Sequence, residues 1–493
     1  MGVPASAVSR VTGVEVSFKN YNIGKSQKLP QRVAIIGVGN DESIYPSEKF
    51  EIEGNAIDVG DRYGYGSPLH LAALQFFPSN GKAAEFPVTC YPLQKANGST
   101  PSEGTIEIIG IAEKNGSGSI KIGGQKALFV VPKTSTAEDA LKIIKNAINS
   151  NLNMPALAGE VENGSLLITS KWAGASSNRI KIKVTANIPG LSIAITDMAD
   201  GAMDPDVTPA LQKIGIVWET QILSAFDYAD NDRLDLYQEW AEGRKGPEEK
   251  KMVLVCHGVT DTLSVRTLIS DERKNDGSNY FIPSINSDEL PFVVAAKGMV
   301  NDVVTTANRN PAQGYKGRLL GLHCGDDDQQ ENSTQRNSSV NKGSSTNIKT
   351  GNVAELCDII TFYHPQNEGK FPSYRYVVDA VKLQNIIYNV RLIMEADELK
   401  GAPLVPDNTP TSNPAAVSPK VIKGWFINLT DSLADDALIS DPEYTKKNIK
   451  VWIDDENPKR VNVVFPVKLS GNVEISSTDV YFGFNLGDAA QAA

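Results

Sequence analysis

Few residues in this 493-residue sequence combine the types and spacing that chemistry at a site requires. The segment Gly37–Gly39 follows an apolar run, and a G-x-G pattern after a strand is part of the loop that holds nucleotide phosphates. The third glycine position of that loop holds Glu42, and the run Asn40–Glu42 would place negative charge where phosphates bind. A tight turn after a strand is therefore favoured over a dinucleotide site.

Two Cys–His neighbours, Cys256-His257 and His323-Cys324, suggest a nucleophile or a metal ligand. Adjacent residues on a strand point to opposite faces, so the members of each pair cannot easily share one ligand. The remaining cysteines and histidines are scattered, without zinc-finger spacing or a disulfide framework. A buried cysteine beside a hydrogen-bonded histidine is the favoured interpretation, and synthesis in a reducing cytoplasm is the simplest one.

The acidic run Asp326–Asp328 resembles a cation site, but it lies in a polar segment without the ligand spacing of an EF-hand. A solvated charge run is the better interpretation. Neither the G-x-S-x-G nor the H-E-x-x-H pattern occurs. The sequence therefore predicts a protein that is not an enzyme, with no catalytic residue, no metal and no cofactor.

Composition and charge argue against nucleic acid and membranes as the main partners of the protein. The formal net charge is -11, whereas a protein that mainly binds nucleic acid needs clustered Lys and Arg. We expect no membrane insertion, because no run of about 18 apolar residues occurs. The first 21 residues lack the apolar core of a signal peptide. The length predicts two to four domains.

An α/β pattern forms the main part of the chain. A buried-strand run at 32–37 precedes a helix that Ser67-Pro68 opens, with serine as N-cap and proline in the first turn. A strand follows at 88–93, and the pattern resumes after Pro205. This alternation favours an α/β (α+β) fold with helices packed on the faces of a sheet. The later strands are predicted at 222–226, 253–256 and 280–285, and the later helices at 234–240, 263–273 and 288–308.

Residues 96–203 differ from the flanking α/β pattern, because their sequence predicts short strands joined by glycine turns. One helix, 136–150, is marked by Ser135 and Glu138, which together predict a capping box. Because this block begins and ends in loops between α/β elements, we interpret it as an inserted β-rich domain. Its strands are predicted at 105–112, 118–122, 125–131, 166–170, 180–185 and 191–197.

The C-terminal part begins with residues 325–352, which are almost wholly polar and predict a long surface loop. A strand near 356–363 and helices at 379–395 and 418–434 follow. The last alternating segments are 449–453, 461–465, and the positions Val480, Phe482 and Phe484.

At the other end, Val14, Val16 and Phe18 alternate with polar residues in an isolated segment. A lone strand cannot satisfy its own backbone, so it must pair with a sheet elsewhere.

Short segments taken in order carry a further signal. The sequence 63–69 (YGYGSPL) leads into Phe86-Pro87-Val88, and 198–205 reads MADGAMDP. Together with the segments below, which span roughly residues 30–485, they resemble the Mu-like contractile tail sheath proteins, relatives of R-type pyocin and other contractile injection sheaths. The polar segment 325–342 is longer than in that family, and the first 30 residues share no clear motif with it. The remaining segments are 118–125, 147–149, 166–169, 178–180, 190–191, 344–346, 359–361, 373–374, 388–391, 417–422 and 457–461.

The resemblance implies a viral structural protein of the bacteriophage tail. Its copies would stack as hexameric rings in a helical assembly around a tail tube and contract for genome ejection. Terminal arms would add strands to neighbouring copies, and the partners would include tube, baseplate and tail terminator proteins. The protein would reside in the virion tail after assembly in the host cytoplasm. The implied regions are an N-terminal arm (1–30), an α/β sheath domain (31–95 and 204–330), the inserted domain (96–203), a tube-proximal domain (331–477) and a C-terminal arm (478–493).

Two sets of residues are predicted to act in assembly. We expect Thr12–Phe18 and Thr478–Phe484 to be donated strands, and contraction to need no ATP hydrolysis. Lys420 and Lys423 are candidates for the tube contact, although an ordinary amphipathic helix explains them as well. The strand-exchange residues are Val14, Val16, Phe18, Val480, Phe482 and Phe484.

Two other functions remain open. The first is a Rossmann-like enzyme with an inserted β domain, which needs a complete phosphate loop. The second is a surface adhesin built around residues 96–203, which needs an export signal.

Overall fold

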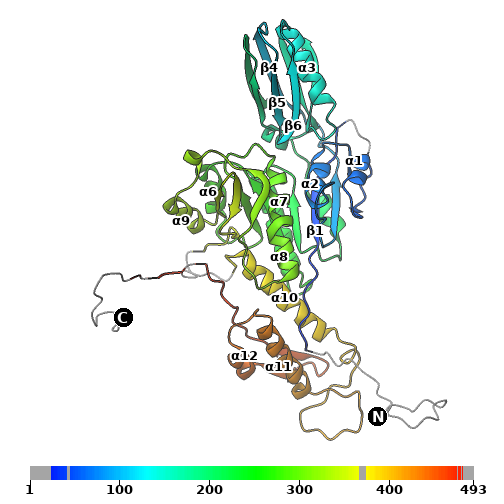
Figure 1. The fold of residues 1–493 in the computed structure, drawn as a ribbon. Helices are drawn as coiled ribbons and strands as arrows, with labels where there is room; N and C mark the ends of the chain where they lie inside the picture. The colour runs from blue at the N-terminus through cyan, green and yellow to red at the C-terminus, as the bar shows by residue number, and fades with distance from the viewer. Residues whose placement is uncertain (1–23, 42–44, 366–373, 475, 479, 481–493) are drawn as a thin grey trace, which may run out of the picture. The chain divides into compact units, whose positions relative to one another are not determined.

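The computed structural model describes residues 24–41, 45–365, 374–474, 476–478 and 480 (Figure 1). They form two compact units. The larger one, here called the body, is Gln27–Leu392, and the terminal unit consists of the described residues on either side of it. The chain therefore passes between the two units twice.

A six-stranded sheet forms the centre of the body, in the order β13-β12-β11-β1-β3-β2. Five of its strands are parallel, and every residue in those five is buried, as expected for a sheet covered on both faces. Only β2 runs antiparallel, against β3. The strands are β1 (Val33–Val38), β2 (Phe50–Glu51), β3 (Val88–Leu93), β11 (Gln221–Ser224), β12 (Leu254–Val259) and β13 (Asn279–Pro283).

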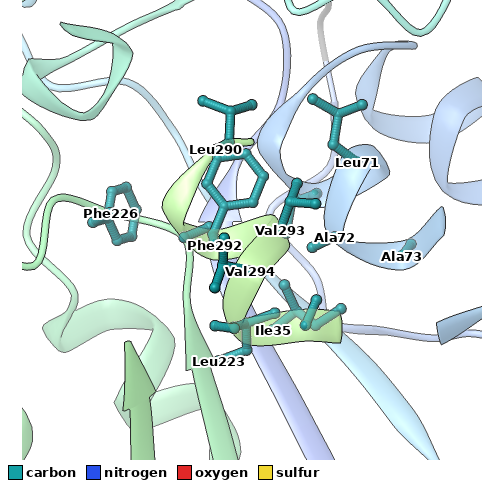
Figure 2. Close-up of a cluster of buried hydrophobic side chains, with 14 of the residues drawn as sticks. Ile35, Leu71, Ala72, Ala73, Leu223, Phe226, Leu290, Phe292, Val293 and Val294 are labelled. Carbon is teal, nitrogen blue, oxygen red and sulfur yellow. The ribbon is translucent and has the colours of Figure 1, made fainter. Parts of the chain in front are cut away.

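Helices pack on both faces of this sheet, which bears out the prediction of mixed helix and sheet. Figure 2 shows Val293 and Val294 of α7 beside Ile35 of β1 and Leu223 of β11. The Ser67 side chain accepts a hydrogen bond from the backbone at the start of α2, as predicted. Apart from α3 and α9, which are described below, the α-helices of the body are α1 (Ile57–Tyr63), α2 (Pro68–Phe76), α4 (Thr208–Ile214), α5 (Asn231–Lys245), α6 (Leu263–Glu272), α7 (Pro291–Gly298), α8 (Val304–Arg309) and α10 (Val377–Met394).

The predicted helix 288–308 is interrupted. A π-helical turn, Met299–Val303, separates α7 from α8. Within it Asp302 is buried, and burial raises the pKa of its carboxyl group to about 6.

Short segments of the chain flank the five parallel strands on both sides. On one side β2 pairs with β3, and on the other Thr361 bridges Tyr280. The Phe362 amide also donates a hydrogen bond to the Asn279 carbonyl, 3.0 Å away. A two-residue strand and an isolated bridge thus flank the parallel strands, and short flanking segments of this kind limit edge-to-edge pairing.

The inserted block between β3 and α4 contains two sheets, in the orders β10-β4-β8-β7 and β6-β5-β9, with α3 packed against β6 and β7 (Figure 1). The capping box of α3 is one residue later than predicted, between Thr136 and Asp139, because a bridge to Ile111 holds Thr136 extended. The elements are β4 (Pro101–Gly110), β5 (Gly116–Ile122), β6 (Gln125–Val131), α3 (Ala137–Asn149), β7 (Ala156–Glu162), β8 (Ser165–Ala173), η1 (Ala175–Arg179), β9 (Ile182–Asn187) and β10 (Leu191–Ala199).

The prediction of a long surface loop at 325–352 is wrong. Asn332 and Gln335 form a capping box that starts a helix, and residues 344–347 are buried. The Ser345 hydroxyl exchanges hydrogen bonds with the Ile360 backbone at 3.1 and 3.0 Å, so this polar segment is satisfied inside the protein. The predicted strand near 356–363 is wrong: the strand β16 ends at Leu356, and Ile360 and Thr361 form only isolated bridges, to Tyr376 and Tyr280. The elements here are β14 (Arg318–His323), η3 (Asp327–Gln329), α9 (Ser333–Asn341), β15 (Asn347–Thr350) and β16 (Val353–Leu356).

The terminal unit contains two helices and a two-stranded hairpin: α11 (Pro419–Asp435), α12 (Pro442–Asn448), β17 (Lys450–Ile453) and β18 (Val461–Val464). The apolar face of α11 buries Phe426, whose ring lies 5.1 Å from that of Phe465. The predicted helix 418–434 and the strands 449–453 and 461–465 agree with these elements. In the described part of the chain, no helix has both the length and the apolar character needed to span a membrane.

Candidate functional site

The crevice at the carboxyl ends of β1 and β11 is the first place to look for a ligand. The order β13-β12-β11-β1-β3 is that of a doubly wound sheet, and such sheets bind ligands where the strand order reverses. Here the chain's own residues fill that position. A Cβ atom on Gly37 would lie 3.0 Å from Ala225, and one on Gly39 would lie 2.5 Å from the Tyr45 ring. These glycines therefore allow close packing within the chain, in keeping with a tight turn.

Aromatic side chains extend this packing toward the inserted domain. Phe226 follows β11, and Leu290 and Phe292 lie at the start of α7 (Figure 2). Trp172 of β8 is fully buried, and its ring lies 6.3 Å from that of Phe292. The inserted block thus shares one apolar core with the helices that cover the sheet.

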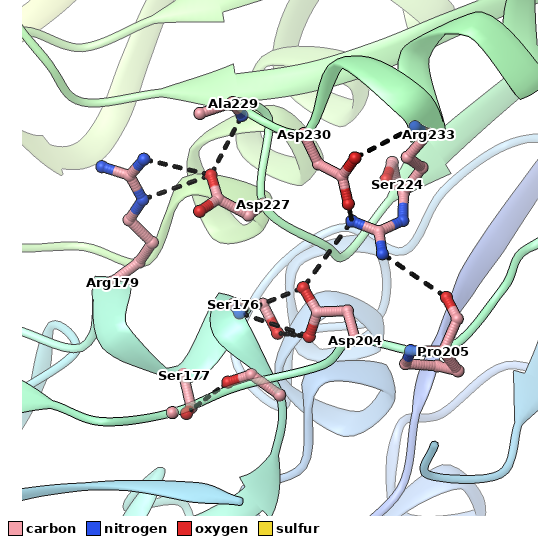
Figure 3. Close-up of polar contacts among 12 residues, drawn as sticks. Ser176, Ser177, Arg179, Asp204, Pro205, Ser224, Asp227, Ala229, Asp230 and Arg233 are labelled. Atoms are coloured by element: carbon pink, nitrogen blue, oxygen red, sulfur yellow. Dashed lines mark hydrogen bonds and ion pairs between the residues drawn. The ribbon is translucent and has the colours of Figure 1, made fainter. Parts of the chain in front are cut away.

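Arg179 forms an ionic contact between the inserted block and the rest of the body. Its guanidinium group lies 3.1 Å from Asp227 and 2.9 Å from Asp261, and it stacks 4.5 Å from the centre of the Tyr228 ring. Figure 3 shows the contact with Asp227, whose carboxylate also accepts a hydrogen bond from the Ala229 amide. Planar stacking and two carboxylates together orient this arginine.

A second polar contact centres on Asp204, where the chain returns from the inserted domain (Figure 3). Its carboxylate accepts hydrogen bonds from the amide and the hydroxyl of Ser176, the latter at 2.8 Å. Arg233 lies 3.7 Å from Asp204 and 2.9 Å from Asp230. Burial raises the pKa of Asp204 above its ordinary value, against the lowering effect of Arg233 and Ser176.

Lysines of the inserted domain complete the contact. Lys121 and Lys183 lie 3.5 and 3.6 Å from Asp288, and the Lys181 ammonium donates to the Ser287 carbonyl at 2.9 Å. A cavity of about 330 Å³ between them is lined by both signs of charge. Basic groups of the insertion therefore meet acidic and carbonyl groups of the body, which fixes the insertion over the carboxyl edge of the sheet.

The acidic partners could have been found from the sequence. Asp227, Asp261 and Asp288 each follow one of the successive parallel strands β11, β12 and β13, whose carboxyl ends share one edge. Arg179, Lys181 and Lys183 alternate in a single segment. The alternating basic residues could be seen in the sequence. Their ion pairs with the aspartates at the strand ends could be inferred only once the order of the strands in the sheet was known.

The first Cys–His pair lies on β12. The His257 ring is hydrogen-bonded to the Asn279 side chain at 2.9 Å and lies against Tyr237, whereas Cys256 is buried beside Tyr280. Burial lowers the pKa of His257 to about 4 and raises that of the Cys256 thiol. The two side chains contact different neighbours and form no common site.

The remaining sequence candidates do not converge either. Cys324 is buried, and the side chain of His323 lies outside the described residues. The run Asp326–Asp328 is exposed; Asp326 caps η3, and Asp327 pairs with Lys349 at 2.7 Å. Across the described ranges, no group of three or more His, Cys, Asp or Glu side chains could hold a metal.

The hairpin of the terminal unit is a different kind of candidate. Lys450 pairs with Val464 and Ile453 with Val461, so each strand uses one edge for its partner. The outer edges of both strands have no backbone partner among the residues described. Trp452 and Val464 are 42% and 45% exposed beside these edges. The arrangement could accept an additional strand on either side.

The predicted assembly residues are only partly described. Lys420 is exposed and Lys423 half-buried in the first turns of α11, and neither ammonium group has an ion-pair partner in the described chain. Val480 is 76% exposed. The other strand-exchange residues, Val14, Val16, Phe18, Phe482 and Phe484, lie outside the described residues, as does Glu42.

Comparison with curated proteins confirms the resemblance to contractile tail sheath proteins. The chain is 24% identical over 428 residues to the Mu-like prophage FluMu tail sheath protein of Haemophilus influenzae, a match that covers 85% of this chain and 86% of that protein. No protein-family profile matches the sequence.

Two solved structures are also similar. The sheath tail protein of Listeria innocua is 12% identical with a TM-score of 0.48, covering 91% of this chain and 94% of that one. The sheath tail protein of Desulfitobacterium hafniense is 13% identical with a TM-score of 0.46, covering 90% and 94%.

Proposed function

We propose that this protein is a structural subunit of a contractile tail sheath, which polymerises as stacked hexameric rings around a tail tube and contracts to drive the tube through a host envelope. The observation that carries the proposal is the match to a tail sheath protein along 85% of the chain. Its place would be the virion tail, after assembly in the host cytoplasm, with tube, baseplate and tail terminator proteins as further partners.

The geometry of the terminal unit supports this assembly. Ser26, near the start of the described chain, donates its amide to the Ser432 hydroxyl of α11 at 2.8 Å. Near the other end, Leu469 forms a bridge with Ile439. Both arms therefore leave from the unit that carries the open-edged hairpin. We assign Thr12–Phe18 and Thr478–Phe484 as strands donated to the outer edges of β17 and β18 in neighbouring copies.

Strand addition between copies would keep neighbouring subunits joined during contraction. Many backbone groups are satisfied together, and alternating side chains fix the register, so neighbours stay joined while they rotate. Contraction then needs two packings of one subunit and no bound nucleotide. On this proposal the chain is not an enzyme.

The tube contact is assigned to Lys420 and Lys423, within the tube-proximal domain 331–477. Exposed ion pairs are worth about 0–1 kcal/mol each, so many weak copies could hold the tube and release it together.

Negative-stain electron microscopy of the purified full-length chain tests the proposal. Striated tubes or stacked rings are expected on concentration. Particles that stay monomeric under all assembly conditions and on added tail tubes would contradict it.

The Rossmann-like alternative gains no support from the crevice. Ala225, Leu69 and Tyr45 occupy the space beside Gly37 and Gly39 that a cofactor would need. Saturable ATP hydrolysis by the purified chain would revive that alternative. An adhesin centred on residues 96–203 gains none either, because that block is docked on the body through Arg179 and Trp172.

A further inference from the structure

Residues 27–31, here called the strap, enter the body as an extended segment that pairs with none of the described strands. Asparagine side chains take the place of a partner strand. The Gln27 amide donates to Asn389 Oδ1 at 2.7 Å, and the Leu29 amide donates to Asn385 Oδ1 at 2.8 Å. The Asn389 side chain returns a hydrogen bond to the Gln27 carbonyl at 2.9 Å.

The same pattern continues on a second helix. The Gln31 amide donates to Asn308 Oδ1 of α8 at 3.1 Å. Three alternate amides of the strap are thus received by three asparagine side chains, here called the asparagine clamp: Asn308, Asn385 and Asn389.

The spacing explains why α10 can bind an extended backbone. Four residues of a helix rise about 6 Å, and two residues of a strand advance about 6.6 Å. Side chains at i and i+4 therefore meet alternate residues of a strand. Asn385 and Asn389 are both buried, and each also donates to a carbonyl of α10 itself, at 2.9 and 2.8 Å. Their amide groups are oriented by the helix as well as by the strap.

The clamp lies where the body ends. Gln27 is the first residue of the body, and Asn389 stands three residues before its last residue, Leu392. The two chain connections to the terminal unit consequently leave the body at one place.

We propose that the asparagine clamp gathers these two connections into a single neck, about which the terminal unit turns while the body keeps its structure. Without the clamp the strap would be a second, loose linker. With it, the root of the N-terminal arm and the end of α10 move together. This inference concerns the unassembled chain and holds independently of the proposed function.

Gln384 provides a matched control on the same helix. Its side-chain amide donates to the carbonyls of Thr220 and Met252, both at 3.1 Å, and so holds the amino ends of β11 and β12 instead of the strap. Removing it should loosen the sheet and leave the strap in place.

The experiment compares the full chain with the double variant Asn385→Ala/Asn389→Ala and with Gln384→Ala, by hydrogen exchange and small-angle X-ray scattering. In the double variant, exchange of the Gln27 and Leu29 amides should rise about tenfold or more, because each loses its acceptor, whereas the Gln31 amide keeps Asn308. Exchange in β12 should stay unchanged, and the distribution of particle dimensions should broaden. Gln384→Ala should show faster exchange in β11 and β12, with the strap and the dimensions unchanged.

Three results would contradict the proposal of a neck. The first is strap exchange that does not respond to the double variant. The second is a double variant with faster exchange in the strap and the sheet alike, and the third is one with unchanged particle dimensions, since the clamp would then be an ordinary part of the body's packing.

Discussion

The body and the terminal unit treat the edges of their sheets in opposite ways. In the body, five parallel strands are flanked by the two-residue strand β2 on one side and by the bridge from Thr361 on the other. In the terminal unit, β17 and β18 form a two-stranded sheet with both outer edges unpaired in the described chain. Two isolated strands are marginally stable in water, whereas three or more with an apolar face are not. The body therefore has a large sheet flanked on both sides, whereas the proposed function would complete the small sheet of the terminal unit with strands from other copies.

The largest effect should come from removing those strands. Deleting residues 1–20, or 478–493, should abolish polymerisation, because the open edges lose the segments proposed to fill them. Circular dichroism and calorimetry should show the body folded as before. Polymers of normal appearance in electron micrographs of a truncated chain would contradict strand donation.

The two units should also unfold separately. Phe426→Ala removes a fully buried ring from the terminal unit and should cost about 3–5 kcal/mol there. Calorimetry should show a lowered transition for the terminal unit and an unchanged one for the body. Val421→Ala, at a 44% exposed position on the same helix, serves as the control and should have little effect. A single transition that shifts as a whole would mean that the two units are one cooperative structure.

The next largest effect is expected on the stability of the body at acid pH. All four histidines, His70, His257, His323 and His364, lie in the body. The pKa of His257 is lowered to about 4 in the folded protein, against about 6.5 when unfolded. Between these values the unfolded chain binds a proton that the folded chain excludes, so His257 reduces stability as the pH falls from about 6.5 to 4.

The measurement is the body's transition temperature against pH for the wild type and for His257→Gln. The variant should lose less stability over that window, with a difference of about 2–3 kcal/mol at pH 4. Asp302, whose raised pKa of about 6 has the opposite effect, is common to both proteins and cancels. Parallel curves would show that His257 does not titrate in this window.

A smaller effect is expected where the insertion meets the body. Arg179→Ala removes ion pairs to Asp227 and Asp261 and a ring stack, which should destabilise the docked insertion by about 1–3 kcal/mol. Hydrogen exchange near η1 and β9 should rise, and added salt should reduce the difference between the proteins. Lys142→Ala removes an exposed pair with Glu138 and should be nearly neutral. Equal effects of the two substitutions would count against a docking role for Arg179.

The smallest effect should be on the surface of the terminal unit. Lys420→Glu/Lys423→Glu reverses two charges and should weaken assembly on tail tubes, measured by co-sedimentation, while self-assembly in the absence of tubes persists. Unchanged tube binding would remove these lysines from the contact.

The secondary structure was predictable from the sequence for some elements and not for others. In the body, buried runs such as 88–93 and the Ser67-Pro68 cap carry local signals strong enough to locate β3 and α2. For the polar segment 325–352 the prediction of a surface loop was wrong. Side chains such as Ser345 form their hydrogen bonds inside the protein. Composition alone cannot distinguish polar residues that bond internally from polar residues that are exposed to water. The helix α12 was missed although Asp441 and Pro442 mark its start.

Contacts between distant segments were beyond reach for another reason. Arg179 and Asp227 are far apart in sequence, and Gln27 and Asn389 are separated by 362 residues. Each pair is in contact only in the folded chain, so neither contact could be predicted without the topology. The pairing of the terminal arms stays a prediction.

The strap leads straight into β1, which lies in the middle of the sheet with parallel neighbours on both sides. Tension on the amino-terminal end would act along this strand, and its hydrogen bonds to β3 and β11 would be loaded in shear. Bonds loaded in this way resist together, whereas at a peeled edge they break one after another. On the proposed function, a pull from a neighbouring copy would pass through the clamp and then load the centre of the sheet rather than an edge strand.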